Sequence, residues 1–166
     1  MSAVFIRTAG EKDLAAVSAL LGKTWHATYD PIYGPGKVDE ITRSWHGVAA
    51  LRPRLTRPTS EFLVADDGND IVAMAFAATS AEGRVVVVHQ LYVDPAHQRR
   101  GIGRDLLAEI VDCFPTASSL RAEVEEANVA AVAFWRRAGF MLTGHTETEL
   151  SGGDVLPVAI YERPIA

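Results

Sequence analysis

The sequence has 166 residues, of which 48% are hydrophobic and 22% are charged, and its formal net charge is −5. This length allows one hydrophobic core of good size, so residues 1–166 are expected to form a single globular domain. Because the chain has no basic surplus to neutralise many phosphates, the charge argues against a nucleic-acid partner.

The single cysteine, Cys113, excludes an intramolecular disulfide and fits a reducing compartment. At the N-terminus, the sequence lacks the basic segment and long apolar run that a signal peptide requires. The longest apolar run is also too short to cross a membrane. We therefore expect a cytoplasmic protein without a membrane partner. Cys113 shares a helical face with Leu106 and Ile110, which favours a packing role.

The first third of the chain is expected to hold one strand and two helices. Residues 3–7 form a short apolar run typical of a strand, and Thr8 with Glu11 fits a capping box that starts a helix. That helix should end near Tyr29, because Asp30-Pro31 follows it. A second helix is expected from residue 38 to about residue 50.

From Glu61 onward the hydrophobic pattern changes to that of strands, interrupted by two helices. The expected strands cover residues 62–65, 71–79, 85–93, 120–125, 140–150 and 155–162. The expected helices cover residues 102–114 and 129–137, and Asn128 is placed to cap the second. Hairpin turns are expected around Asp67-Gly68 and at residues 151–154. The β-branched run at residues 85–93 suggests a strand that is buried on both faces.

This order of elements indicates an α+β or α/β domain on a single mixed sheet. The strands at 85–93 and 120–125 flank a helix, so they should be parallel and joined by a right-handed crossover. Ligands of such sheets bind at the carboxyl ends of strands, which draws attention to the loop that follows the strand at 85–93.

That loop is rich in glycine and arginine and leads directly into a helix. The first backbone N–H groups of a helix have no internal partner, and the helix dipole adds partial positive charge there. Gly101 and Gly103 lack a Cβ and would let the main chain approach a ligand closely, while Arg99 and Arg100 add formal positive charge. The loop therefore predicts a site for a phosphate-bearing ligand.

Two common phosphate-binding motifs do not fit this loop. A P-loop requires Gly-Lys-Ser/Thr, whereas Gly103 is followed by Arg104-Asp105. A dinucleotide-binding fingerprint requires a third glycine or alanine, and Leu106 occupies that position.

Two blocks of sequence together resemble the GNAT superfamily of N-acetyltransferases. The first is Leu91-Tyr92-Val93-Asp94-Pro95 followed by Gln98-Arg99-Arg100-Gly101-Ile102-Gly103. The second is Asn128-x-x-Ala131-x-x-Phe134-Trp135-x-x-x-Gly139-Phe140. The resemblance implies an α+β (three-layer) fold, with a mixed, mostly antiparallel sheet of about seven strands flanked by about four helices.

The resemblance also implies acetyl-CoA as cosubstrate, with no metal. Main-chain amides would hold its pyrophosphate, contributed by Gln98, Arg99, Arg100, Gly101, Ile102, Gly103 and Arg104. The strand residues Leu91, Tyr92 and Val93 would contact the pantetheine arm, and one of their amides would polarise the thioester carbonyl. Asn128 would bind near the same arm, although it could also serve only as an N-cap. Trp135 would pack against the arm.

Acetyl transfer to an amine requires a base, and two residues stand where family members carry one. Glu123 lies five residues before Asn128, and His89 lies two residues before Leu91. Glu123 could instead pair with Arg121, and His89 could be a structural histidine in an apolar strand. Both remain candidates for the catalytic base.

Trp135 departs from the family pattern, because many members have a tyrosine there whose hydroxyl is thought to protonate the departing thiolate. An indole cannot do this. Tyr29, Tyr33 and Tyr92 are candidates to replace that hydroxyl. If none of them does, the protein could be an acyl-CoA-binding module with little or no turnover.

The acceptor pocket is expected among the aromatic residues of the first helices, with His26, Tyr29 and Tyr33 as candidate substrate-binding residues. The expected acceptor is a small-molecule or peptide amine. A nucleotide-binding regulator is a third interpretation of the glycine loop. A homodimer formed through an exposed final strand is also compatible with the sequence.

Overall fold

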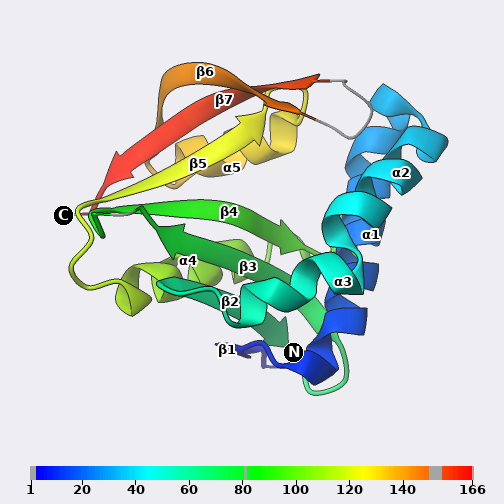
Figure 1. The fold of residues 1–166 in the computed structure, drawn as a ribbon, viewed down its shortest axis with the longest axis horizontal. Helices are drawn as coiled ribbons and strands as arrows, with labels where there is room; N and C mark the ends of the chain where they lie inside the picture. Colours follow the sequence, from blue (N-terminus) through cyan, green and yellow to red (C-terminus); the bar gives the residue numbers. More distant parts are fainter. Residues whose placement is uncertain (1–2, 81, 150–154, 166) are drawn as a thin grey trace.

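The computed structural model describes residues 3–80, 82–149 and 155–165. Within these residues one sheet of seven strands runs in the order β1-β2-β3-β4-β5-β7-β6 (Figure 1). The strands are β1 (Phe5–Thr8), β2 (Ser60–Asp66), β3 (Ile71–Thr79), β4 (Val85–Val93), β5 (Ser119–Glu125), β6 (Met141–Glu149) and β7 (Val155–Pro164). Neighbouring strands are antiparallel except β4 and β5, which are parallel as expected.

The helices pack on both faces of this sheet. The α-helices are α1 (Leu14–Tyr33), α2 (Pro35–His46), α3 (Val48–Leu51), α4 (Ile102–Cys113) and α5 (Val129–Arg137). Short 3-10 turns are η1 (Glu11–Asp13), η2 (Arg52–Leu55) and η3 (Pro95–His97). The α+β fold with a mostly antiparallel seven-stranded sheet, expected from the sequence, is therefore confirmed.

Alternate residues of the central strands point into two separate core layers. On β2, Leu63 packs in the layer that contains Leu106 of α4 and Trp135 of α5. Its neighbour Val64 packs in the opposite layer, which contains Leu21 of α1. The period of two along a strand thus divides the apolar residues between the two helical layers.

The expected burial of β4 on both faces is confirmed only in part. Val86, Val88 and Gln90 are buried, whereas His89 is exposed. The register with β3 shifts here, because Phe76 is opposite Gln90 and Ala77 is opposite Val88, which leaves His89 as the extra residue of a β-bulge. On one face of β4, Val88 packs in the layer of α4, and on the other, Tyr92 packs in the layer of α1. The end of the strand beyond the bulge also lines a cleft.

The start of the first helical segment also differs from the expected capping box. The segment begins at η1, where the Asp13 carboxylate accepts a hydrogen bond from the Gly10 N–H at 2.8 Å. Arg7 donates to the same carboxylate at 2.8 and 2.9 Å. The residue that reaches back is therefore Asp13, and Glu11 instead pairs with Arg52 at 2.8 Å.

The first helix continues past Pro31 to Tyr33. A proline removes one backbone donor, but the next turn still closes, since the Gly34 N–H donates to the Asp30 carbonyl at 2.9 Å. Tyr33 also stacks on Tyr29 with ring centroids 5.8 Å apart. The helix thus carries its aromatic side chains one turn further than the sequence predicts.

The expected second helix is divided in two at Gly47, which is extended (φ −67°, ψ 159°) between α2 and α3. A Cβ built on Gly47 would lie 2.9 Å from the carbonyl oxygen of Arg43, so this break requires a glycine. In the C-terminal half, α4, α5 and β3 to β7 agree with the expected elements within about two residues. The turn expected at residues 151–154 lies outside the described residues.

Among the residues that the structure describes, no helix is both long enough and apolar enough to span a lipid bilayer.

Candidate active site

A large cleft opens where the two parallel strands diverge. The pairing of β4 with β5 covers Val85–Val88 and Ser119–Ala122, and beyond it the strands separate (Figure 1). The cleft has a volume of about 1350 Å³ and is lined by residues of α1, α2, β4, β5, α5 and the glycine loop. Such a volume exceeds that of most small-ligand pockets and suits a long cosubstrate together with an acceptor.

The glycine loop, residues 98–104, lies at one end of this cleft and has a backbone suited to an anion. Arg99 and Gly101 both have left-handed backbone conformations, with φ of 66° and 83°. The first α4 hydrogen bond runs from the Asp105 N–H to the Gly101 carbonyl at 3.0 Å, so the amides of residues 102–104 precede the helical ladder. Alternating backbone conformations of this kind turn successive N–H groups toward one point, which favours an anion.

The loop is anchored to the end of β4 by a side chain. Gln98 donates from its amide nitrogen to the Val93 carbonyl at 3.1 Å. The side chain of Gln98 therefore has a structural role, while its backbone opens the loop.

Gly103 has a steric reason to be a glycine in addition to the predicted approach to a ligand. A Cβ at this position would lie 3.0 Å from the Phe134 ring and 3.6 Å from Leu91. Gly103 itself is not among the residues that line the cleft. Its missing side chain lets α4 pack closely on α5, and this packing sets where the helix N-terminus lies.

Asn128 connects α5 to the first helix, α1. Its carbonyl oxygen accepts from the Ala131 N–H at 3.1 Å, which confirms the predicted N-cap. Its amide nitrogen donates to the Tyr29 hydroxyl at 3.3 Å. Tyr29 is buried, and this burial raises the pKa of its hydroxyl, which is thus protonated at neutral pH.

The two candidate bases, Glu123 and His89, line the same cleft. Glu123 is exposed and accepts from Arg121 at 3.2 Å, as the alternative interpretation expected. His89, in the bulge of β4, lies against the Phe76 ring at 5.8 Å. Desolvation, followed by the charge of Arg57, lowers the pKa of His89, so its imidazole is neutral at pH 7. The geometry brings both bases together without choosing between them.

Trp135 is a core residue at the floor of the cleft. It is 6% exposed, and its ring makes edge contacts with Phe134 at 5.1 Å and Phe140 at 4.8 Å. Tyr29 and Tyr92 also line the cleft, and burial raises the pKa of both hydroxyls. Protonated phenols from other elements are therefore present in the cleft.

The predicted acceptor residues separate into two groups. Tyr29 lines the cleft, and Tyr33 stacks on it. His26 is not among the lining residues, because its imidazole bridges Asp30 at 2.6 Å and Asp39 at 2.8 Å. These two carboxylates raise the pKa of His26, which joins α1 to α2.

The sequence analysis missed a buried polar network on one wall of the cleft. The Arg54 guanidinium donates to the side-chain oxygen of Gln90 and, at 3.2 Å, to the Trp45 carbonyl. The side-chain amide nitrogen of Gln90 donates a hydrogen bond to Nδ1 of His46 at 3.1 Å. Burial lowers the pKa of His46 to about 4. A glutamine within the apolar run of β4 was the available signal.

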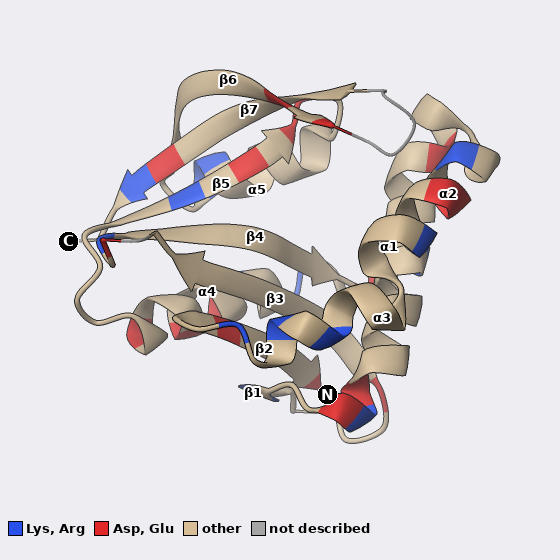
Figure 2. Ribbon diagram, viewed as in Figure 1, with Lys and Arg blue, Asp and Glu red and all other residues tan. Residues whose placement is uncertain are grey.

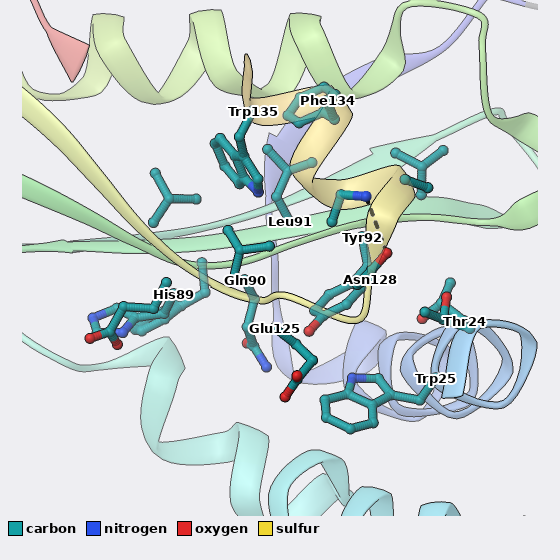
Figure 3. Close-up of a pocket in the computed structure, with 18 of the residues that line it drawn as sticks. Thr24, Trp25, His89, Gln90, Leu91, Tyr92, Glu125, Asn128, Phe134 and Trp135 are labelled. Atoms are coloured by element: carbon teal, nitrogen blue, oxygen red, sulfur yellow. Dashed lines mark hydrogen bonds between the residues drawn. The ribbon is translucent and has the colours of Figure 1, made fainter. Parts of the chain in front are cut away.

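Glu125 is a second residue that the sequence analysis missed. It lines the cleft, is 8% exposed, and its Oε2 atom has no hydrogen-bond partner among the described residues. Figure 3 shows its carboxylate pointing into the space between Gln90 and Trp25. Figure 2 shows acidic residues toward the C-terminal end of β5, after a basic one, and basic residues in the segment that follows α3. The described side chains include no group of three or more His, Cys, Asp or Glu placed to hold a metal ion.

Comparisons with known proteins agree with this geometry. The sequence model of the Acetyltransferase (GNAT) family matches residues 23–140. N-alpha-acetyltransferase RimI of Mycobacterium tuberculosis is 38% identical over 100 residues, which cover 58% of this chain and 61% of that protein. The [Ribosomal protein bS18]-alanine N-acetyltransferase of Salmonella typhimurium is 38% identical over 68 residues, covering 40% of this chain and 46% of that protein.

The matched regions thus span about three fifths or less of these relatives. Among solved structures, the PaiA N-acetyltransferase of Thermoplasma acidophilum, in complex with coenzyme A, superposes with a TM-score of 0.81. That alignment covers 98% of this chain and 99% of the other at 19% identity, and it supports the fold. Because the family model covers well over half of the sequence, the chain belongs to the acetyltransferase (GNAT) family.

Proposed function

We propose that the protein transfers the acetyl group of acetyl-CoA to a primary amine by direct attack of the amine. The main support for this proposal is that two features occur in one cleft. The cleft holds the diverging strand β4, whose Leu91 and Val93 line it, and it ends at the main-chain anion site of the glycine loop. A long ligand with a phosphate at one end and a reactive group at the other fits this arrangement.

The residues present fit acetyl-CoA. The amides of residues 98–104 would bind the pyrophosphate, with Arg99 and Arg100 adding positive charge. The main chain of Leu91 and Val93 would orient the pantetheine arm, and Trp135 would pack beneath it. Acetyl-CoA bound there would supply an activated acetyl thioester. An amide of β4 is suited to stabilise negative charge on the thioester oxygen.

Proton transfer would use side chains on the other side of the cleft. An alkylammonium has a pKa of about 10, and it must lose a proton before the resulting amine can attack. Glu123 and His89 are the candidate acceptors of that proton, and His89 is neutral at pH 7 because its pKa is lowered. Tyr29 is the candidate donor to the departing thiolate, since its protonated hydroxyl is held by Asn128.

The acceptor is proposed to be a small-molecule or peptide amine. Support for a peptide α-amine comes from the names of the two relatives, since one is an N-alpha-acetyltransferase and the other acts on an alanine of ribosomal protein bS18. We also place the protein in the cytoplasm, because a single half-buried cysteine suits a reducing compartment.

A homodimer would have to form differently from the sequence-based expectation. The final strand, β7, lies between β5 and β6 and is not an edge strand. The edge strands are β1 and β6, and Met141 and Leu142 of β6 are 73% and 46% exposed. Strand pairing between subunits would therefore use one of these two strands.

The test is a screen for release of coenzyme A thiol with acetyl-CoA and a panel of primary amines. The panel includes free amino acids, simple alkylamines and peptides with a free N-terminus, and mass spectrometry identifies each product. We expect thiol release and a product heavier by one acetyl group for at least one amine.

A second candidate function is an acyl-CoA-binding module, which Trp135 favours because it replaces the hydroxyl of the family pattern. Binding of acetyl-CoA without thiol release for any amine would support the module and contradict acetyl transfer. If ATP or NAD displaces coenzyme A from the glycine loop, the nucleotide-binding interpretation gains support instead.

A further inference from the structure

We propose that Glu125 binds the ammonium group of the acceptor amine, as an acceptor-binding residue separate from the candidate base. This inference rests on the proposed function and adds to it the place where the acceptor is recognised. It starts from a buried carboxylate that has no cation partner among the described residues.

The position of Glu125 follows from the strand that carries it. Glu123 and Glu125 are two residues apart on β5, so both side chains point to the same face of the sheet. Glu125 is opposite Val158 of β7, farther along the strand than Glu123. It therefore lies deeper in the widening part of the cleft, where Figure 3 shows it between Gln90 and Trp25.

The two carboxylates differ in how their charge is compensated. Glu123 is exposed and paired with Arg121. Glu125 is 8% exposed, and the ion pairs of the described residues do not include it. A buried carboxylate is costly unless it is paired and hydrogen-bonded. The missing cation would then come from a ligand.

Two basic residues of the cleft wall, Arg54 and Arg57, have other partners, and Arg57 lies over the Phe76 ring at 5.7 Å. Arg54 uses its guanidinium on Gln90 and the Trp45 carbonyl. Tyr33 is the polar neighbour of Glu125, and burial together with this carboxylate raises the pKa of Tyr33 to about 12. A protonated phenol can donate a hydrogen bond to a carboxylate but supplies no positive charge, so a site for a cation remains.

The surroundings of Glu125 suit a primary ammonium in particular. Trp25 and Tyr29 lie in ring contact at 4.5 Å, and Tyr29 stacks on Tyr33. Aromatic faces attract a cation, and an ammonium carries three donors, of which one can satisfy Oε2. A neutral alcohol of the same size would leave the buried charge uncompensated. The site therefore discriminates by charge as well as by shape.

The assignment divides the work between two carboxylates. Glu125 would bind and orient the charged amine, and the exposed pair of Glu123 and His89 would remain available to remove the proton. Replacing Glu125 should then weaken acceptor binding and leave acetyl-CoA binding unchanged.

The experiment measures binding directly, so it does not depend on turnover. Butylamine is titrated into the full-length protein in the presence of coenzyme A, and tryptophan fluorescence is followed because Trp25 lies beside the site. Butan-1-ol is the neutral probe. The variants are Glu125→Gln, the conservative Glu125→Asp, and Tyr33→Phe, which keeps the carboxylate but removes its neighbouring hydroxyl.

The matched control is Glu126→Gln, because Glu126 is the adjacent carboxylate, is exposed and pairs with His145 at 2.6 Å outside the cleft. We expect Glu125→Gln to raise the Kd for butylamine by about ten- to a hundredfold, the usual range for losing a charged hydrogen bond. Glu125→Asp should recover part of this loss, and Tyr33→Phe should raise the Kd by a smaller factor. The affinities for coenzyme A and butan-1-ol should not change.

Turnover then separates this inference from the proposed function. With the best amine of the panel, Glu125→Gln should raise KM much more than it lowers kcat. Equal behaviour of Glu125→Gln and Glu126→Gln in both assays would overturn the inference while leaving acetyl transfer intact. A fall in kcat with unchanged KM and Kd would also overturn it, since Glu125 would then act on the proton and not on binding. A wild-type protein that binds butylamine through Glu125 but turns over no amine would contradict only the proposed function.

Discussion

The buried imidazole of His46 should make the stability of the protein depend on pH between about 4 and 6.5. Burial, followed by the charge of Arg54, lowers the pKa of His46 from 6.5 to about 4 in the folded protein. Below pH 6.5 the unfolded chain therefore takes up a proton that the folded chain does not bind. The stabilisation is fully present above pH 6.5 and is lost as the pH falls toward 4. At about 1.4 kcal/mol for each pH unit, the loss amounts to about 3 kcal/mol.

The measurement is urea unfolding of the wild-type protein and of His46→Gln at several pH values from 7.5 to 4.0. Glutamine does not titrate and can still accept a hydrogen bond from Gln90. Other groups titrate in both proteins, including His89 with a lowered pKa and His26 with a raised one, so the difference between the two curves isolates His46. We expect the free energy of unfolding of the variant to fall by about 3 kcal/mol less over this range. Parallel curves would show that His46 is not buried as a neutral group, and the network with Arg54 and Gln90 would then be wrong.

Four further variants test the glycine loop, the base and the N-cap of α5. Gly103→Trp should abolish coenzyme A binding in isothermal titration, because its side chain would collide with Phe134 and displace the helix N-terminus; retained affinity would refute the loop assignment. Glu123→Gln or His89→Gln should remove the acid limb of the kcat/KM profile if that residue is the base, and an unchanged profile in both would exclude them. For His89 this limb should lie below pH 6.5, because its pKa is lowered. Asn128→Ala should reduce the free energy of unfolding by about 0.5–2 kcal/mol through loss of the N-cap, measured by urea unfolding; no loss would contradict the cap.

The C-terminal half of the fold was predictable because its signals are local. Asn128 caps the helix that it was expected to cap, and Gly139 ends it with a φ of 91°. Such signals act within one turn of backbone and do not depend on distant packing. In the first third, the predicted boundaries failed where tertiary contacts override local preference. The helix continues through Pro31 because the aromatic residues of its last turns pack together.

The candidate site likewise has a part that could be predicted from the sequence and a part that could not. The glycine loop consists of consecutive residues, so its position in the chain could be predicted. The steric constraint at Gly103 could not be predicted. The need for a glycine there depends on Phe134, which is 31 residues away in sequence and touches it only in the folded protein. Glu125 and His46 were missed because a carboxylate or an imidazole has no sequence signature of burial. Their environment is created by α1, α2 and β5 together.

Trp135 is compatible with the proposed catalysis because binding of the donor and proton transfer depend on different parts of the chain. The donor would be held mainly by main-chain groups, which do not depend on the identity of most side chains. Proton transfer and acceptor recognition depend on side chains, and these can be supplied by different elements of the same cleft. Tyr29 lies on α1, yet Asn128 on the opposite wall holds its hydroxyl at 3.3 Å. In the proposed mechanism, Tyr29 of α1 would supply the hydroxyl that α5 lacks, and Asn128, which starts α5, would position it.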